Sequence, residues 1–179
     1  MFRREHGFSL LELLIVVTIL GIAATVAIPD FSAATPNKLE LAAEEFAQAM
    51  RFARSEAMRT GQPHGFRQQS GAKRIRVFRP DTTVSPWLPI YDVYHPISKK
   101  LYDIVLDTHP FASVETITRT PTFRGTCNIT GNIYFDGNGT ARCLDPETVL
   151  LEEFNMTLTL DKHTRIVTLQ GITGRVTVQ

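Results

Sequence analysis

The beginning of the chain limits the possible folds most strongly. An apolar run covers residues 8–28 and contains one charged residue, Glu12. A bilayer core of ~30 Å is crossed by ~20 helical residues, so the run predicts a transmembrane helix. Arg3 and Arg4 precede it, and positive charge of this kind stays on the cytoplasmic side. The rest of the chain is therefore expected outside the cytoplasm.

A cleaved secretory signal is the alternative reading of this segment. Such a signal has basic residues, a shorter apolar core and a cleavage site of small residues, which Ala23, Ala24 and Ala27 could supply. Glu12 argues against it. An ionised carboxylate within a membrane span costs ~2.5–3.5 kcal/mol even on insertion scales, so such a residue usually has a partner and a role.

Residues 7–12, Gly-Phe-Ser-Leu-Leu-Glu, resemble the processing signature of type IV pilins and type II secretion pseudopilins. The resemblance implies that a prepilin peptidase cuts between Gly7 and Phe8 and that the new amine of Phe8 is N-methylated. It also implies a single-pass protein of the bacterial inner membrane with a periplasmic C-terminal domain.

Glu12 would then have a physical role in assembly. Residues four apart lie on one helix face, so its carboxylate comes near the amine of Phe8 or that of an adjacent subunit. Each charge is costly alone in low dielectric, and pairing offsets much of that cost. The expected partners are other pilins or pseudopilins, joined through a bundle of N-terminal helices.

A second, amphipathic helix is expected over residues 38–60. Leu39, Ala43, Phe46, Met50, Ala53 and Ala57 recur at three- and four-residue steps. Thr35-Pro36-Asn37 is typical of a helix start, Gly61 of a helix end, and Pro29 predicts a bend before it. Residues 52–57, Phe-Ala-Arg-Ser-Glu-Ala, resemble a segment of the GspH/FimT group of minor pilins and pseudopilins, and Arg54 would complement the helix dipole there.

The remainder alternates and turns like a β-rich domain. Strands are expected at residues 73–79, 87–94, 101–106, 114–118, 131–135, 156–160, 165–169 and 175–178. Residues 138–153 are expected to form a long loop that is mobile except where Cys143 ties it down. Ile133, Phe135 and Gly139, and Gly174-Arg175-Val176, resemble further elements of the same group. The predicted fold is α+β and pilin-like: a long N-terminal helix, its first half in the membrane, packed on antiparallel sheet.

These observations divide the chain into four parts. Residues 1–7 are the cleaved leader, 8–28 the transmembrane and assembly half of the helix, 29–60 its amphipathic half, and 61–179 the β-rich periplasmic domain. Cys127 and Cys143 lie in the periplasmic part, where a disulfide is plausible and free thiols are the alternative. A metal site is not expected from two cysteines without flanking histidine.

No pattern in the sequence selects a catalytic site, a metal or a cofactor. His64, His95, His109 and His163 are scattered near turns and prolines, and no serine has the setting of a nucleophile. The formal net charge of +1 does not indicate that the chain binds nucleic acid. The chain is therefore not expected to be an enzyme.

DNA binding is possible but not favoured. A basic cluster, Arg67, Lys73, Arg74, Arg76 and Arg79, is interleaved with Phe66 and Phe78 and could contact phosphates. Some members of the resembled group bind DNA through Gly-Arg-x-Arg, but after Gly174-Arg175 this chain has Thr177 at the second arginine position. The sequence thus predicts a minor pilin or pseudopilin that acts in assembly or priming near a filament tip; the alternative is a DNA-binding minor pilin for natural transformation.

Overall fold

The computed structural model describes residues 10–26, 34–69, 74–106, 114–128 and 132–179. The chain divides into two units, Met1–Ala33 and Ala34–Gln179. The first unit contains α1, Leu10–Val26, a helix of 17 residues in which Glu12 is the one charged side chain. In the part of the chain that the structure describes, no helix combines the length and the apolar character needed to cross a membrane. The predicted span, residues 8–28, reaches beyond both ends of α1, and the bend predicted at Pro29 lies outside the described residues.

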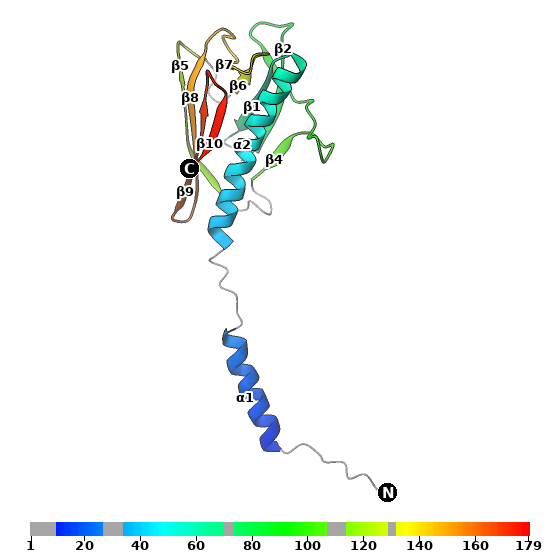
Figure 1. The fold of residues 1–179 in the computed structure, drawn as a ribbon, viewed down its shortest axis with the longest axis vertical. Helices are drawn as coiled ribbons and strands as arrows, with labels where there is room; N and C mark the ends of the chain where they lie inside the picture. The colour runs from blue at the N-terminus through cyan, green and yellow to red at the C-terminus, as the bar shows by residue number, and fades with distance from the viewer. Residues whose placement is uncertain (1–9, 27–33, 70–73, 107–113, 129–131) are drawn as a thin grey trace. The chain divides into compact units, whose positions relative to one another are not determined.

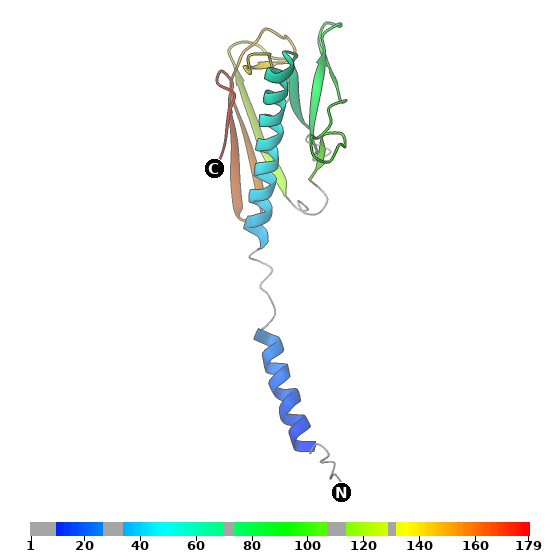
Figure 2. The ribbon, with the colours of Figure 1, turned by 45° about the vertical axis from the view of Figure 1, so that its right-hand side comes forward.

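The second unit is built around α2, Ala34–Thr60. Figures 1 and 2 show this helix lying against two sheets of strands. The stripe predicted from the sequence is fully buried: Leu39, Ala43, Phe46, Met50, Ala53 and Ala57. Ala42, Ala47 and Ala49 are buried as well, because the helix contacts strands of both sheets and so buries a wide face. The helix ends where predicted, since Gly61 adopts a φ of 68° that few side-chain-bearing residues tolerate.

The larger sheet has six strands in the order β3-β2-β1-β6-β7, with β4 also pairing with β2. Its strands are β1 His64–Gln69, β2 Arg74–Asp81, β3 Leu88–Ile90, β4 Asp103–Val105, β6 Asn132–Phe135 and β7 Ala141–Cys143. The described pairs are antiparallel. The central strand β1 was not predicted, because its residues are mostly polar and show no alternation; it is nevertheless covered on both sides.

Phe78 covers the face of the larger sheet that is turned away from α2. It also explains why apolar and polar residues do not alternate strictly along β2. Its ring faces away from α2 and packs with Tyr134 and Leu144 in a second, smaller core, against which Trp87 and Tyr91 lie. Gly65 makes room for it, since a Cβ there would lie 2.5 Å from Phe78 Cζ. The larger sheet therefore has apolar packing on both faces.

The smaller sheet has the order β10-β9-β8-β5 and is also antiparallel. Its strands are β5 Glu115–Phe123, β8 Leu151–Leu160, β9 His163–Gln170 and β10 Arg175–Val178. The prediction for residues 175–178 is confirmed, and β5 and β8 are longer than predicted. One face of β8 supplies Phe154, Met156 and Leu158 to the main core.

The prediction of a long mobile loop over residues 138–153 is wrong. β7 and the start of β8 lie within it, and backbone hydrogen bonds join Cys143 N to Val149 O and Ala141 N to Gly171 O at 2.9 Å each. The disulfide between Cys127 and Cys143 is present, with Cα atoms 6.0 Å apart. A closed loop of this size adds ~3 kcal/mol of stability in the chain-entropy account.

Gly171 provides a sharp test of the packing between the ends of β8 and β9 in the smaller sheet. A Cβ at this position would overlap the carbonyl oxygen of Leu151, whereas one at Gly125 would make an ordinary 3.5 Å contact with Val149. We expect Gly171→Ala to lower stability by ~1–3 kcal/mol, as overpacking does. At about 2–4 °C per kcal/mol, the shift is measurable by circular dichroism during heating. An unchanged Tm, equal to that of the Gly125→Ala control, would contradict the packing described here.

Candidate functional site

The residues of the predicted assembly site lie at the start of the chain. Gly7 and Phe8 are outside the described residues, and Glu12 lies in the first turn of α1. A carboxylate in the first turn is favoured by the helix dipole. The large apolar side chains of α1, from Leu10 to Leu20, are exposed in the isolated chain, as is Glu12.

Three segments singled out in the sequence meet at Arg54 of α2. Its Nε donates a hydrogen bond to the carbonyl oxygen of Gly139 at 3.2 Å. A Cβ at Gly174 would overlap the Arg54 side chain, and one at Gly139 would lie 3.0 Å from Arg54 Nε. Gly139 and Gly174 also have φ values of 79° and 63°. Glycine is thus required at both turns for two reasons: the backbone φ is positive, and a Cβ would clash with the side chain of Arg54.

This arrangement corrects the role expected for Arg54. The sequence suggested that its charge complements the C-terminus of α2, but its observed contact is with the turn before β7 and the turn before β10. Arg59 is the basic residue in the last turn, where it pairs with Glu56 at 2.6 Å. The hydrogen bond from Arg59 lowers the pKa of Glu56.

The arginines of the basic cluster have partners in the structure. Arg74 and Arg76 both contact Asp103, the latter at 3.4 Å, and Arg79 pairs with Asp92 at 2.6 Å. Arg67 donates to Tyr91 Oη at 3.1 Å. Lys73 lies outside the described residues.

The aromatic residues of the cluster are not available to stack on bases. Phe66 and Phe78 are fully buried, on opposite faces of the larger sheet. Arg175 is exposed at the start of β10, away from the cluster on β1 and β2. The structure thus brings Arg67, Arg74 and Arg76 together on β1 and β2, where Asp103 contacts two of them, and leaves Arg175 on the other sheet.

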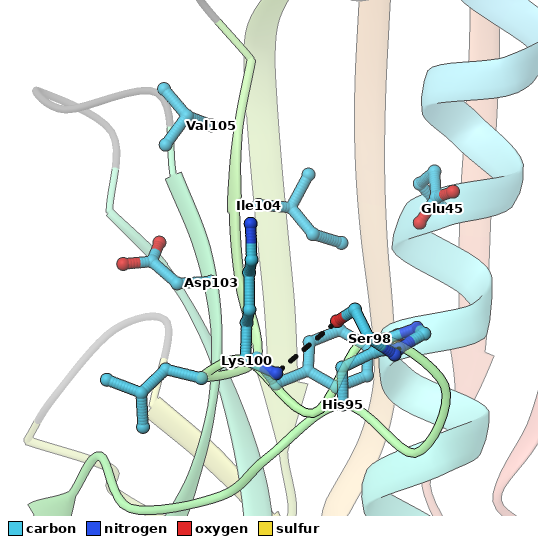
Figure 3. Close-up of a pocket in the computed structure, with 9 residues that line it drawn as sticks. Glu45, His95, Ser98, Lys100, Asp103, Ile104 and Val105 are labelled. Carbon is cyan, nitrogen blue, oxygen red and sulfur yellow. Dashed lines mark hydrogen bonds between the residues drawn. The ribbon is translucent and has the colours of Figure 1, made fainter.

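A pocket of about 320 Å³ opens between α2 and β4, and sequence reasoning did not find it. Figure 3 shows Glu45 on the helix side and His95, Ser98 and Lys100 on the loop that leads to β4. Tyr102 forms part of its wall; burial, followed by the charge of Glu45, raises the pKa of Tyr102 to about 12. The phenol is therefore neutral at physiological pH. Within the described residues, no three His, Cys, Asp or Glu side chains cluster to hold a metal ion.

The fold and the N-terminal motif define a pilin-type structural subunit. The profile of the prokaryotic N-terminal methylation motif matches residues 2–28. That of the Type II transport protein GspH matches residues 42–173, which is most of the chain. The chain belongs to the GspH family, as the resemblance implied.

Solved structures support the fold. The minor pseudopilin EpsH from the Type 2 Secretion System of Vibrio cholerae has 14% identity and a TM-score of 0.52, covering 79% of this chain and 96% of its own. The type IV minor pilin FimU of Pseudomonas aeruginosa has 17% identity and a TM-score of 0.50, covering 80% of this chain and 90% of its own. At these identities the likeness concerns the fold alone, and it confirms the predicted pilin-like α+β class. No curated protein matches the chain.

Arg54 can be tested by two substitutions. We expect Arg54→Ala to cost ~1–3 kcal/mol, because the buried Gly139 loses the donor to its carbonyl. Arg54→Lys should cost nearly as much, since lysine keeps the charge but not the geometry of the guanidinium. The free energy of unfolding in urea measures both. Arg59→Ala, at a mostly exposed side chain, is the control and should change little. Full stability of Arg54→Lys would favour the dipole role instead.

Proposed function

We propose that this chain is a minor subunit, in a type IV pilus or a type II secretion pseudopilus, that acts in assembly or priming near the filament tip. Prepilin peptidase removes residues 1–7 by cutting between Gly7 and Phe8, and Phe8 is N-methylated. Residues 8–28 anchor the chain in the bacterial inner membrane, with the N-terminus cytoplasmic. Residues 29–60 carry the helix into the periplasm, where residues 61–179 form the globular domain.

The observation that carries this proposal is the composition of α1. The helix is apolar except for Glu12, Thr18 and Thr25, and Thr18 donates hydrogen bonds to the carbonyls of Leu14 and Ile15. A helix that is apolar on all faces is stable only when lipid or other helices cover it. Glu12 has no basic residue within α1 to pair with, so the Phe8 amine of a neighbouring subunit is its natural partner.

Replacing Glu12 separates processing from assembly. We expect Glu12→Val to be cut after Gly7 as the wild type is, because the peptidase site is intact. Its recovery in the sheared filament fraction should fall at least ~10-fold, since a loss of about 1.4 kcal/mol per subunit contact already gives that factor. Mass spectrometry of the N-terminus and quantitative immunoblots measure the two steps. Thr18→Val on the same helix is the matched control, and wild-type recovery of Glu12→Val would contradict the pairing.

DNA uptake is the second candidate, and the exposed Arg175 beside Gly174 is the observation that keeps it open. The arginines of β2 weaken it, because Arg74 and Arg76 contact Asp103 and Arg79 pairs with Asp92. We therefore favour the structural role.

Fluorescence anisotropy with a labelled duplex tests this candidate across a salt series. We expect no binding of micromolar strength, because the arginines of β2 in the basic cluster already contact Asp103 and Asp92 and have less charge to offer phosphates. Arg175→Ala and Arg79→Ala serve as the paired variants. Micromolar binding that weakens steeply with salt and is lost in Arg175→Ala alone would establish the DNA-binding alternative.

A further inference from the structure

Two arginines lie directly across from each other on the larger sheet. Arg67 of β1 and Arg76 of β2 are cross-strand partners in the antiparallel pairing of these strands. Side chains two residues apart on a strand share one face, so Arg76 lies on the same face as Phe78, the face turned away from α2. Like charges directly opposite each other destabilise a sheet. An anion beside the two arginines would offset that cost.

The carboxylate that the structure places beside them, Asp103 of β4, is largely taken by a third arginine. Arg74 Nε donates to Asp103 Oδ1 at 3.0 Å and Arg74 Nη2 donates to Oδ2, so this guanidinium binds both oxygens. Arg76 Nε lies 3.4 Å from Oδ2, close enough for an ion pair but without the geometry of a hydrogen bond. One carboxylate is therefore divided between two guanidinium groups.

Arg76 and Arg67 are left with weaker contacts. Arg76 Nε is buried and has no hydrogen-bond partner within the described part of the chain. The Arg76 guanidinium lies over the ring of Tyr91, 5.0 Å from its centroid, and Arg67 donates to the neutral acceptor Tyr91 Oη at 3.1 Å. A buried donor that lacks an acceptor costs free energy, and a charged one costs more. An acceptor supplied by another molecule would therefore be stabilising here.

A pocket of about 190 Å³ gives such a molecule access to Arg76. Arg76 and Asp103 are the charged residues that line it. The rest of its lining is apolar or aromatic: Val77, Tyr91, Val93, Leu101 and Tyr102. Small-molecule sites have this composition, with mostly apolar walls and a few placed polar groups.

We propose that this pocket binds one aliphatic carboxylate, which accepts a hydrogen bond from Arg76 Nε and packs a short apolar stem against Val93 and Leu101. A single negative charge suits the site better than a phosphate dianion, because Asp103 lines the same pocket and repels further negative charge. The volume holds one small group and not a row of phosphates, so the proposal is distinct from DNA binding.

Two sources carry this chemical group: a free carboxylic acid, and an acidic residue or chain terminus of a protein. Neither the cleavage after Gly7 nor the pairing of Glu12 enters into the binding. Its test is therefore independent of the proposed function.

NMR of the full chain in detergent micelles tests the site, with butyrate as the probe. The Nε–H group of Arg76 gives its own ¹H–¹⁵N signal, which is assigned by its loss in Arg76→Lys. We expect this signal to move saturably with a Kd on the order of 1 mM, as suits a ligand of about six non-hydrogen atoms. Butanol has the same stem without the charge and should bind at least about 10-fold more weakly.

Variants show whether Arg76 makes the contact. Arg76→Gln should weaken butyrate binding at least about 10-fold, and Arg76→Lys nearly as much, because lysine keeps the charge but lacks the Nε–H group. Arg79→Gln removes the same charge from the same strand outside the pocket and is the matched control, with an expected change below about twofold. Saturation transfer to the butyrate methyl protons measures binding, against protein-free micelles. Circular dichroism shows that each variant is folded, and the wild-type titration needs no variant.

A photo-crosslinker separates the two sources of the carboxylate. Leu101 is 50% exposed and lines the pocket, so p-benzoylphenylalanine is placed there in whole cells. A cross-link to another subunit that is competed by butyrate and lost in Arg76→Gln assigns the carboxylate to a protein. Butyrate binding without such a cross-link assigns it to a free acid.

Four results would overturn the proposal. The first is an Arg76 Nε–H signal that does not move at about ten times the expected Kd of butyrate. The second is equal binding of butanol, which would make the pocket merely apolar. The third is tighter binding of inorganic phosphate than of butyrate. The fourth is unchanged butyrate binding by Arg76→Gln.

Discussion

The burial of α2 against both sheets is the constraint on which the globular unit depends. Its side chains alternate between large residues such as Phe46 and Met50 and small ones such as Ala43 and Ala53, all fully buried. Alanine brings the strands close to the helix axis, and the large residues fill the space between the sheets. A helix with so broad an apolar face has no stable position in water alone. Each sheet in turn needs α2, since its inner face would otherwise be exposed.

Arg54 extends this dependence to the turns at the end of the helix. Arg54 lies one turn beyond Met50 on α2. Where Met50 packs in the apolar core, the guanidinium of Arg54 donates a hydrogen bond to the carbonyl of Gly139. Gly174 allows the second turn to close over the same side chain. One arginine thereby positions the approach to β7 and to β10, which lie in different sheets. Segments that are separate in the sequence are joined by a contact that no local pattern encodes.

The sequence predicts well where local physics decides the structure. The period of α2, the glycine that ends it and the alternation in β10 are all local, and each was found. β1 was missed because His64 and Gln68 are polar and would be expected at the surface. Neighbouring strands bury them, and that burial is not encoded in the local sequence. β7 is three residues long and exists through its pairing with β6. The partners of the basic cluster could not be predicted for a related reason: Asp103 and Asp92 are separated in sequence from the arginines that they contact.

That neutralisation gives a physical criterion for the sites proposed here. The arginines of β2 find their partners within the chain, in Asp103 and Asp92. A charge that has no partner within the chain is available to a second molecule. Among the described residues, Glu12 on α1 is in this position, on an apolar helix. In the proposed function, Glu12 would use this availability to pair with a neighbouring subunit and so fix the packing of the helices.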